Sequence, residues 1–67
     1  MNPNEVIHLL KGFSYPAEEY RGTVQIEMDP HNEANKVTRE EISAALQHKV
    51  PMDNIRQITP WTITILF

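Results

Sequence analysis

The residues whose types could perform chemistry are few and scattered in this chain of 67 residues. Histidine occurs three times, as His8, His31 and His48, and cysteine is absent. A zinc site needs several converging nitrogen or sulfur ligands, at spacings such as His-x3-His. Because no such spacing occurs, we expect neither a metal nor any other cofactor.

One loop places a histidine among carboxylates, since His31 stands between Asp29 and Glu33. The alternation of polar side chains here loosely resembles a calcium-binding loop. It lacks the central glycine and the closing bidentate glutamate that such a loop requires. We therefore interpret the segment as a solvated turn that follows Asp29-Pro30.

Nucleophilic and acid–base catalysis find no support in the sequence. Neither Ser14 nor Ser43 lies in a glycine-rich elbow. The paired glutamates at 18–19 and 40–41 are direct neighbours, and adjacent side chains on a helix point apart. We expect a protein that is not an enzyme.

Aromatic side chains are the remaining candidates for function, because tyrosine and tryptophan are enriched in binding hot spots. The alternative is structural: Trp61 would begin the buried face of the last strand, and the tyrosines would cover the first helix. The sequence leaves both interpretations open. The candidate protein-interaction residues are these aromatics and the second face of the C-terminal strand: Tyr15, Tyr20, Trp61, Thr62, Thr64 and Leu66.

Composition limits the class of protein further. Hydrophobic residues make up 40% of the chain, charged residues 22%, and the net charge is −3. These values are typical of a folded domain, and six scattered Lys and Arg residues argue against nucleic-acid binding. No apolar run approaches the roughly 20 residues that span a bilayer, and no signal segment is visible. We expect a cytoplasmic protein, folded as one small domain over residues 1–67.

Two helices are expected. The first should start at Asn2, with Pro3 at its first position, and run to about Lys11 before Gly12 closes it. The second should begin after Thr38, which forms a capping box with Glu41, and run from Arg39 to about Lys49. Each carries a short apolar stripe at helical spacing: Val6, Leu9, Leu10 and Phe13 in the first; Ile42, Ala45, Leu46 and Val50 in the second.

Strand patterns occur at two or three places. Residues 23–28 alternate between apolar and polar side chains, 55–58 form a short candidate strand, and 61–67 alternate up to Phe67. Residues 14–21 allow one helical turn before Gly22. The fold class is therefore α+β, a two-layer α/β arrangement in the order α-β-α-β(β). Its two helices pack on one face of a two- or three-stranded sheet, whose main strands could pair parallel or antiparallel.

Self-association is expected because small domains without disulfides have little core, and the C-terminal strand carries no charge or proline from Trp61 onward. We interpret the chain as a small acidic interaction or regulatory protein that binds another protein and forms a homodimer through this strand. Phage and plasmid accessory proteins are often of this kind. The alternative is a nucleic-acid-associated regulator, in which Lys36 and Arg39 join a basic patch only when two subunits meet.

Overall fold

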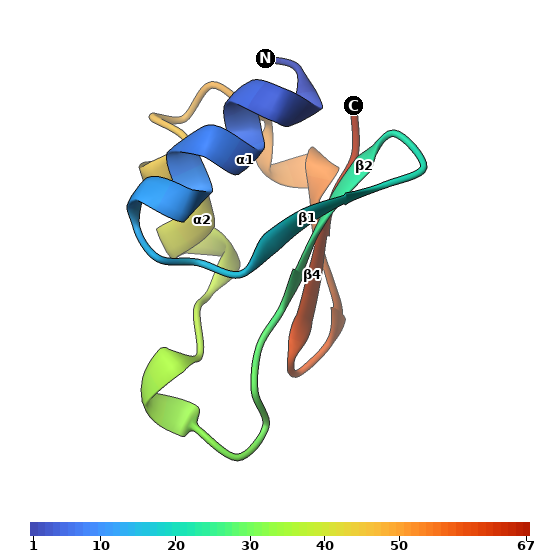
Figure 1. Cartoon of the computed structure of the whole chain (residues 1–67). Coiled ribbons are helices and arrows are strands. Elements are labelled where there is room, and N and C mark those ends of the chain that lie inside the picture. The colour runs from blue at the N-terminus through green and yellow to red at the C-terminus, as the bar shows by residue number, and fades with distance from the viewer.

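The chain folds into two layers in a computed structural model that describes residues 1–67. Two α-helices lie on one face of a four-stranded antiparallel sheet (Figure 1). The expected α+β class is confirmed, whereas the sheet has one strand more than the sequence indicated. All pairings are antiparallel, which resolves the alternative that the sequence left open.

Helix α1 spans Pro3–Gly12 and starts as expected, because the side chain of Asn2 accepts a hydrogen bond of 2.9 Å from the amide of Glu5. Its end differs from the expectation. Gly12 lies inside the helix, and Ser14 takes the left-handed conformation (φ 63°) that follows the last turn. The amides of Ser14 and Tyr15 donate to the carbonyls of Lys11 and Leu10, which is the Schellman pattern.

Helix α2 spans Arg39–Ala45 and begins with the expected capping box between Thr38 and Glu41. It ends earlier than the expected Lys49, because a second Schellman motif terminates it. The amide of His48 donates to the carbonyl of Ser43, while Gln47 and His48 both have positive φ angles, 58° and 57°. A glycine usually marks a helix end of this type, and neither residue is glycine. The sequence therefore contained no sign that the helix ends here.

The sheet consists of β1 (Ala17–Tyr20), β2 (Thr23–Glu27), β3 (Ile55–Thr59) and β4 (Thr62–Ile65). The 3₁₀ helices are η1 (Glu33–Asn35), on a loop that extends past the end of the sheet, and η2 (Met52–Asn54), just before β3. Strand β1 replaces the helical turn expected at residues 14–21. A two-residue turn at Arg21 and Gly22, both with positive φ, joins it to β2.

Strand β4 lies in the interior of the sheet, since the strand order is β1-β2-β4-β3. Val24 pairs with Ile65 on one side of β4, and Ile55 pairs with the same residue on the other. The prediction that this strand is an exposed edge, available for pairing with a second subunit, is therefore wrong. Its uncharged composition reflects a central position, where both rows of backbone groups are already paired.

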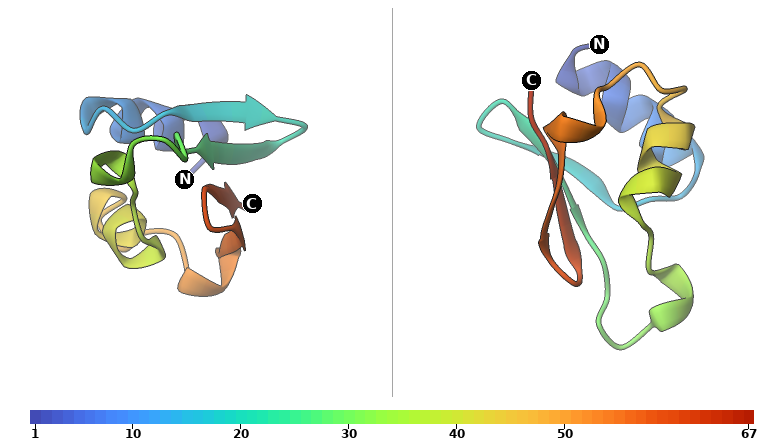
Figure 2. Two further views of the ribbon diagram at one scale, coloured as in Figure 1. Left: turned by 90° about the horizontal axis from the view of Figure 1, so that it is seen from below. Right: turned by 180° about the vertical axis from the view of Figure 1, so that it is seen from behind.

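The core lies between the sheet and the helices, as the two further views of the ribbon show (Figure 2). It contains every residue of the expected α2 stripe and the alternate positions of β2 and β4. Of the expected α1 stripe, Phe13 is 56% exposed because it lies beyond the last turn. Neither helix has the length and apolar character needed to cross a bilayer. The fully buried large side chains are Val6, Leu10, Val24, Ile26, Ile42, Leu46, Ile55, Ile63 and Ile65.

Candidate functional site

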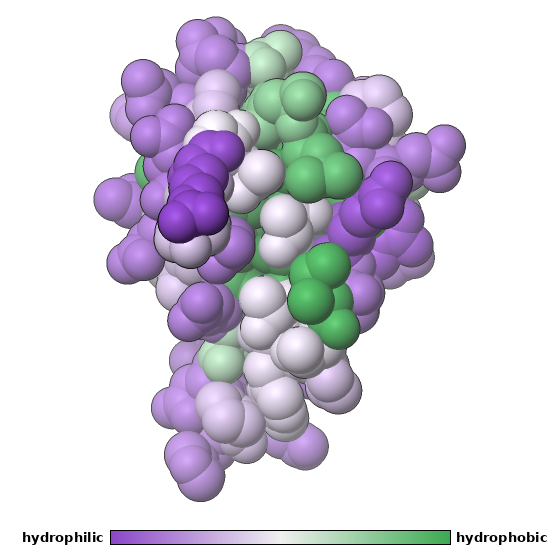
Figure 3. All heavy atoms as spheres, turned by 90° about the vertical axis from the view of Figure 1, so that its right-hand side faces the viewer, coloured by the Kyte–Doolittle hydropathy of each residue, from purple (hydrophilic) through white to green (hydrophobic).

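The face of the sheet opposite the helices is turned toward the viewer in Figure 3. Side chains of directly paired residues point to the same face of an antiparallel sheet. Because Ile26 and Ile63 face the core, their neighbours along each strand face outward. We call this outward surface the open face. One row of it crosses all strands in the order Glu18, Gln25, Thr64, Arg56.

The open face has an uncharged centre. Thr62, Thr64 and Leu66 follow one another along β4 and its extension, and all three are partly buried. In Figure 3 near-neutral and hydrophobic side chains run down the middle, with hydrophilic side chains on both sides. The exposed large side chains Ile58 (60%) and Tyr20 (54%) add apolar surface toward the two edges of the sheet.

Charge is divided unequally across the open face. In β1 and β2 the outward side chains include Glu18 and Glu27, and these strands contain no basic residue. In β3 the charged residue is Arg56, and β4 carries no charge. Arg21, in the turn after β1, places its guanidinium 5.4 Å from the ring centroid of Tyr20, so the side with the two glutamates also carries one basic group. Along the row that crosses all four strands, the acidic end is Glu18 and the basic end is Arg56.

The structure brings four of the six candidate interaction residues together on the open face. Tyr20 lies on β1, Thr62 and Thr64 on β4, and Leu66 immediately after it, where its amide donates a 2.8 Å hydrogen bond to the carbonyl of Asn54. Tyr15 and Trp61 lie elsewhere. The candidate set therefore divides into one coherent surface and two separate aromatics.

Trp61 lies at the turn between β3 and β4 rather than within the last strand. It is half-buried, packs against the core, and has the Nζ atom of Lys36 at 4.8 Å from its ring centroid. The ring of Trp61 therefore packs against the core from outside and stays partly exposed to solvent.

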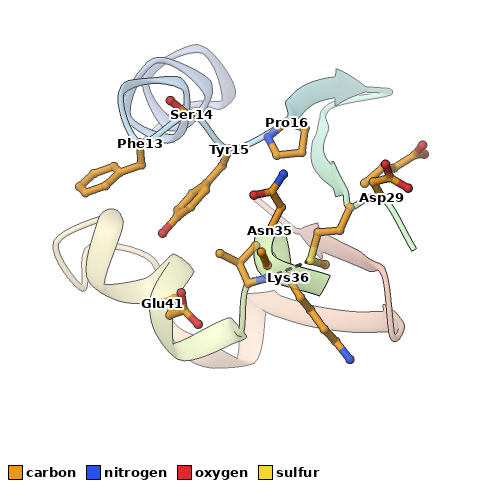
Figure 4. A pocket seen from close by; sticks show the side chains of 12 residues that line it. Phe13, Ser14, Tyr15, Pro16, Asp29, Asn35, Lys36 and Glu41 are labelled. Carbon is orange, nitrogen blue, oxygen red and sulfur yellow. Dashed lines mark hydrogen bonds between the residues drawn. The ribbon is translucent and has the colours of Figure 1, made fainter. Parts of the chain in front are cut away.

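Tyr15 lies in the connection from α1 to β1, where its ring stacks on that of Phe13 with a centroid distance of 5.8 Å. These two rings form part of the wall of a cleft of about 530 Å³. The rest of the wall comes from Pro16, the end of β2, the η1 segment and the start of α2. Figure 4 shows Phe13 and Tyr15 toward one end of this aromatic cleft and Asp29 toward the other.

The edges of the sheet are protected against further strand pairing. Strand β1 carries Glu18 and Glu19 and is preceded by Pro16, while β3 has a register irregularity between Gln57 and Thr59. Charge, proline and bulges are the usual devices that prevent edge-to-edge association. Pairing of a further strand at either edge is therefore disfavoured.

Ser43 and His48 form the one serine–histidine contact, with Oγ at 3.2 Å from Nδ1. Ser43 is buried at the end of α2 and its own carbonyl accepts the amide of His48. This contact joins the end of α2 to the residues that follow it. No three histidine or acidic side chains converge in a way that could hold a metal ion.

Sequence reasoning missed Glu18, Arg56 and Ile58 as surface residues of one face. The spacing of Ile55 and Ile58 gave no firm signal, because β3 has a register irregularity between Gln57 and Thr59 that interrupts the alternation of faces. The relation between Glu18 and Arg56 carried no local signal, since it depends on the strand order.

Comparisons with models of protein families, with curated proteins and with solved structures found no match for this chain. The class that the fold defines is a small two-layer α+β protein with an uncovered sheet face. Any function must therefore be argued from its surfaces.

Proposed function

We propose that this protein is a non-enzymatic interaction protein that associates with a second copy of itself through the open face. The observation that carries the proposal is the row Glu18, Gln25, Thr64, Arg56, which is acidic at one end and basic at the other. A surface that pairs with its own copy around a twofold axis must be self-complementary. This row meets that requirement in one orientation.

The orientation follows from the charges. With a twofold axis parallel to the strands and between β2 and β4, the row of one subunit meets the same row of the other in reverse order. Glu18 then faces Arg56 of the second copy, and Gln25 faces Thr64. With the axis perpendicular to the strands, Glu18 would face Glu18 and Arg56 would face Arg56, and such like-charge contacts are unfavourable.

The centre of the open face suits the same arrangement. Reversal places Thr23 opposite Leu66 of the second copy and Glu27 opposite Thr62, so no like charges meet. Two sheets that pack face to face keep their strands roughly aligned, at about 30°. Four strands of four or five residues form a face of roughly 15–20 Å on each side, about 300–400 Å² in plan. A standard interface buries roughly 800 Å² per partner. We therefore expect a dimer that dissociates on dilution.

The alternative function, binding of nucleic acid through a dimer-generated basic patch, receives less support. Arg39, one of its two named residues, donates hydrogen bonds from Nε and Nη2 to the carbonyls of Ile55 and Met52. Lys36 lies against the ring of Trp61. A gel shift at low salt tests this alternative, because phosphate binding weakens steeply as salt rises.

Sedimentation equilibrium over a range of protein concentrations tests the dimer. Glu18→Arg and Arg56→Glu should each weaken association by about tenfold, since each replaces two symmetric attractions with repulsions. The double variant Glu18→Arg/Arg56→Glu should restore the native constant, because it only exchanges the two charges.

The matched control is Glu19→Arg, which makes the same change of charge on the neighbouring residue. Glu19 pairs with Val24 and belongs to the other face, so its replacement should leave association unchanged. A native chain that stays monomeric at high micromolar concentration would contradict the dimer. A double variant as weak as the single ones would contradict the proposed axis.

A further inference from the structure

We propose that the aromatic cleft binds an extended peptide segment of a partner protein that carries an apolar side chain next to an arginine. The proposal rests on the cleft alone and is independent of association through the open face. Its volume, about 530 Å³, lies within the range of ligand-binding clefts. The wall combines exposed aromatic rings with carboxylates, and these two features identify the occupant.

The aromatic end suits an apolar side chain. Phe13 is one of the few large hydrophobic residues that is more than half exposed, and its ring is held in place by stacking on Tyr15 at an interplanar angle of 19°. Tyr15 is itself packed against the core, so the pair forms a rigid platform. Aromatic platforms of this kind also accept the planar face of a guanidinium group.

The charges of the cleft favour a basic residue near the apolar one in the bound peptide. Apart from Glu27, whose side chain belongs to the open face, its acidic lining residues are Asp29 and Glu41, and its basic residue is Lys36. Lys36 places its Nζ atom 4.8 Å from the ring centroid of Trp61, which is not part of the lining, and Figure 4 shows its side chain directed away from Phe13 and Tyr15. The one ammonium group of the lining is therefore held near Trp61, away from the aromatic end of the cleft.

Arginine is favoured over lysine because its planar guanidinium can donate two parallel hydrogen bonds to one carboxylate. Glu41 already accepts hydrogen bonds from the amide and hydroxyl of Thr38. In Figure 4 Asp29 lies at the opposite end of the cleft from Phe13, with Pro16 and Asn35 between them. We infer that the peptide runs from the aromatic pair toward Asp29.

The test uses the full chain, labelled with ¹⁵N, and the probe peptide acetyl-Leu-Ala-Arg-amide. Its matched control peptide has citrulline in place of arginine, which keeps the shape and removes the charge. Amide signals of Tyr15, Asn35 and Val37 should shift with a Kd of about 1 mM, and the citrulline peptide should bind about five- to tenfold more weakly. Equal binding of the two peptides, or no shifts at these residues, would overturn the proposal.

Two variants separate the ends of the cleft. Phe13→Ala should weaken binding of the probe, whereas Phe67→Ala removes a similarly exposed ring outside the cleft and should not. Asp29→Asn keeps an acceptor for the amide of His31 while removing the charge, and should reduce the preference for arginine over citrulline. Asp53→Asn, outside the cleft, is its control. A Phe13→Ala chain that binds the probe like the native one would refute the aromatic platform.

Discussion

The Nη2 atom of Arg39 donates a hydrogen bond of 2.7 Å to the carbonyl oxygen of Met52, and so ties the start of α2 to the turn before β3. Its Nε atom makes a second bond, of 2.5 Å, to the carbonyl of Ile55. Hydrogen bonds to a charged group contribute about 1.5–3 kcal/mol each to the free energy of unfolding. Removal of the guanidinium would leave the carbonyls of Met52 and Ile55 without this donor. Arg39→Met should therefore lower the free energy of unfolding by about 2–3 kcal/mol, measured by urea denaturation.

Arg39→Lys serves as the control for charge. An ammonium group keeps the positive charge but lacks the fork that reaches two carbonyls at once. Most of the loss should therefore remain in this variant. Recovery of the full native stability with lysine would show that charge, rather than hydrogen-bond geometry, is what matters at this position.

The end of α1 should be improved by exchanging two residues. Gly12 lies within the helix, and a Cβ atom there would meet nothing within 4 Å, whereas Ser14 holds a left-handed conformation that favours glycine. Gly12→Ala and Ser14→Gly should each stabilise the protein by about 0.5–1 kcal/mol. For a domain of this size that raises the melting temperature by about 2–8 °C each. A lower melting temperature for Ser14→Gly would argue against the Schellman end.

The capping box of α2 should be measurable through Thr38. Its Oγ1 atom accepts a 3.1 Å hydrogen bond from the amide of Glu41. Thr38→Ala should cost about 1 kcal/mol in urea denaturation, while Thr38→Ser keeps the acceptor and should cost much less. Equal losses in the two variants would assign the effect to packing instead of capping.

Isoleucines on the two sides of the sheet should respond differently to truncation. Ile63 is completely buried in β4, whereas Ile58 is largely exposed in β3. Ile63→Ala should cost about 2–5 kcal/mol, enough to unfold much of the population. Ile58→Ala should change stability by no more than about 0.5 kcal/mol. Far-UV circular dichroism at a fixed, low protein concentration distinguishes the two outcomes without interference from association.

Removal of residues 65–67 should abolish folding. Ile65 pairs with both Val24 and Ile55 and is completely buried, so its loss shortens the central strand on both sides and removes a core side chain. Removal of Phe67 alone, an exposed residue beyond the strand, is the control and should leave the fold intact. A cooperative thermal transition in the longer deletion would contradict the central role of β4.

Local signals predicted the elements that depend on neighbours in the chain. The caps at Asn2 and Thr38 and the alternation in β2 are short-range patterns, and the structure confirms each of them. Strand β1 was missed because Ala-Glu-Glu has weak strand propensity; its geometry comes from pairing with β2. The ends of both helices depend on left-handed residues other than glycine, which sequence patterns do not reveal.

The candidate site depended on information that the sequence does not contain. Tyr20 was named for its residue type, and Thr64 and Leu66 for the alternation that puts them on one face of the C-terminal strand. The placement of Tyr20 on the same face of the sheet follows from the strand order. The same order overturned the predicted edge pairing of the C-terminal strand. The position of a strand within a sheet is set by pairing between distant segments. The composition of the C-terminal strand could therefore indicate that it pairs with other strands, but not which strands these are.

The central place of β4 also governs the order in which the fold can be built. The β1–β2 and β3–β4 hairpins close over short loops, whereas Val24 and Ile65 are separated by 41 positions (65 − 24). During synthesis β1, β2 and both helices emerge before the strand that completes their core. Until β4 emerges, β2 pairs with β1 along one edge, and its other edge has no strand to pair with. The nascent chain therefore passes through a stage in which this edge of β2, which carries Val24 and Ile26, is open. Joining the two hairpins is the step that closes the longest loop in the sheet, and we expect it to limit the rate of folding.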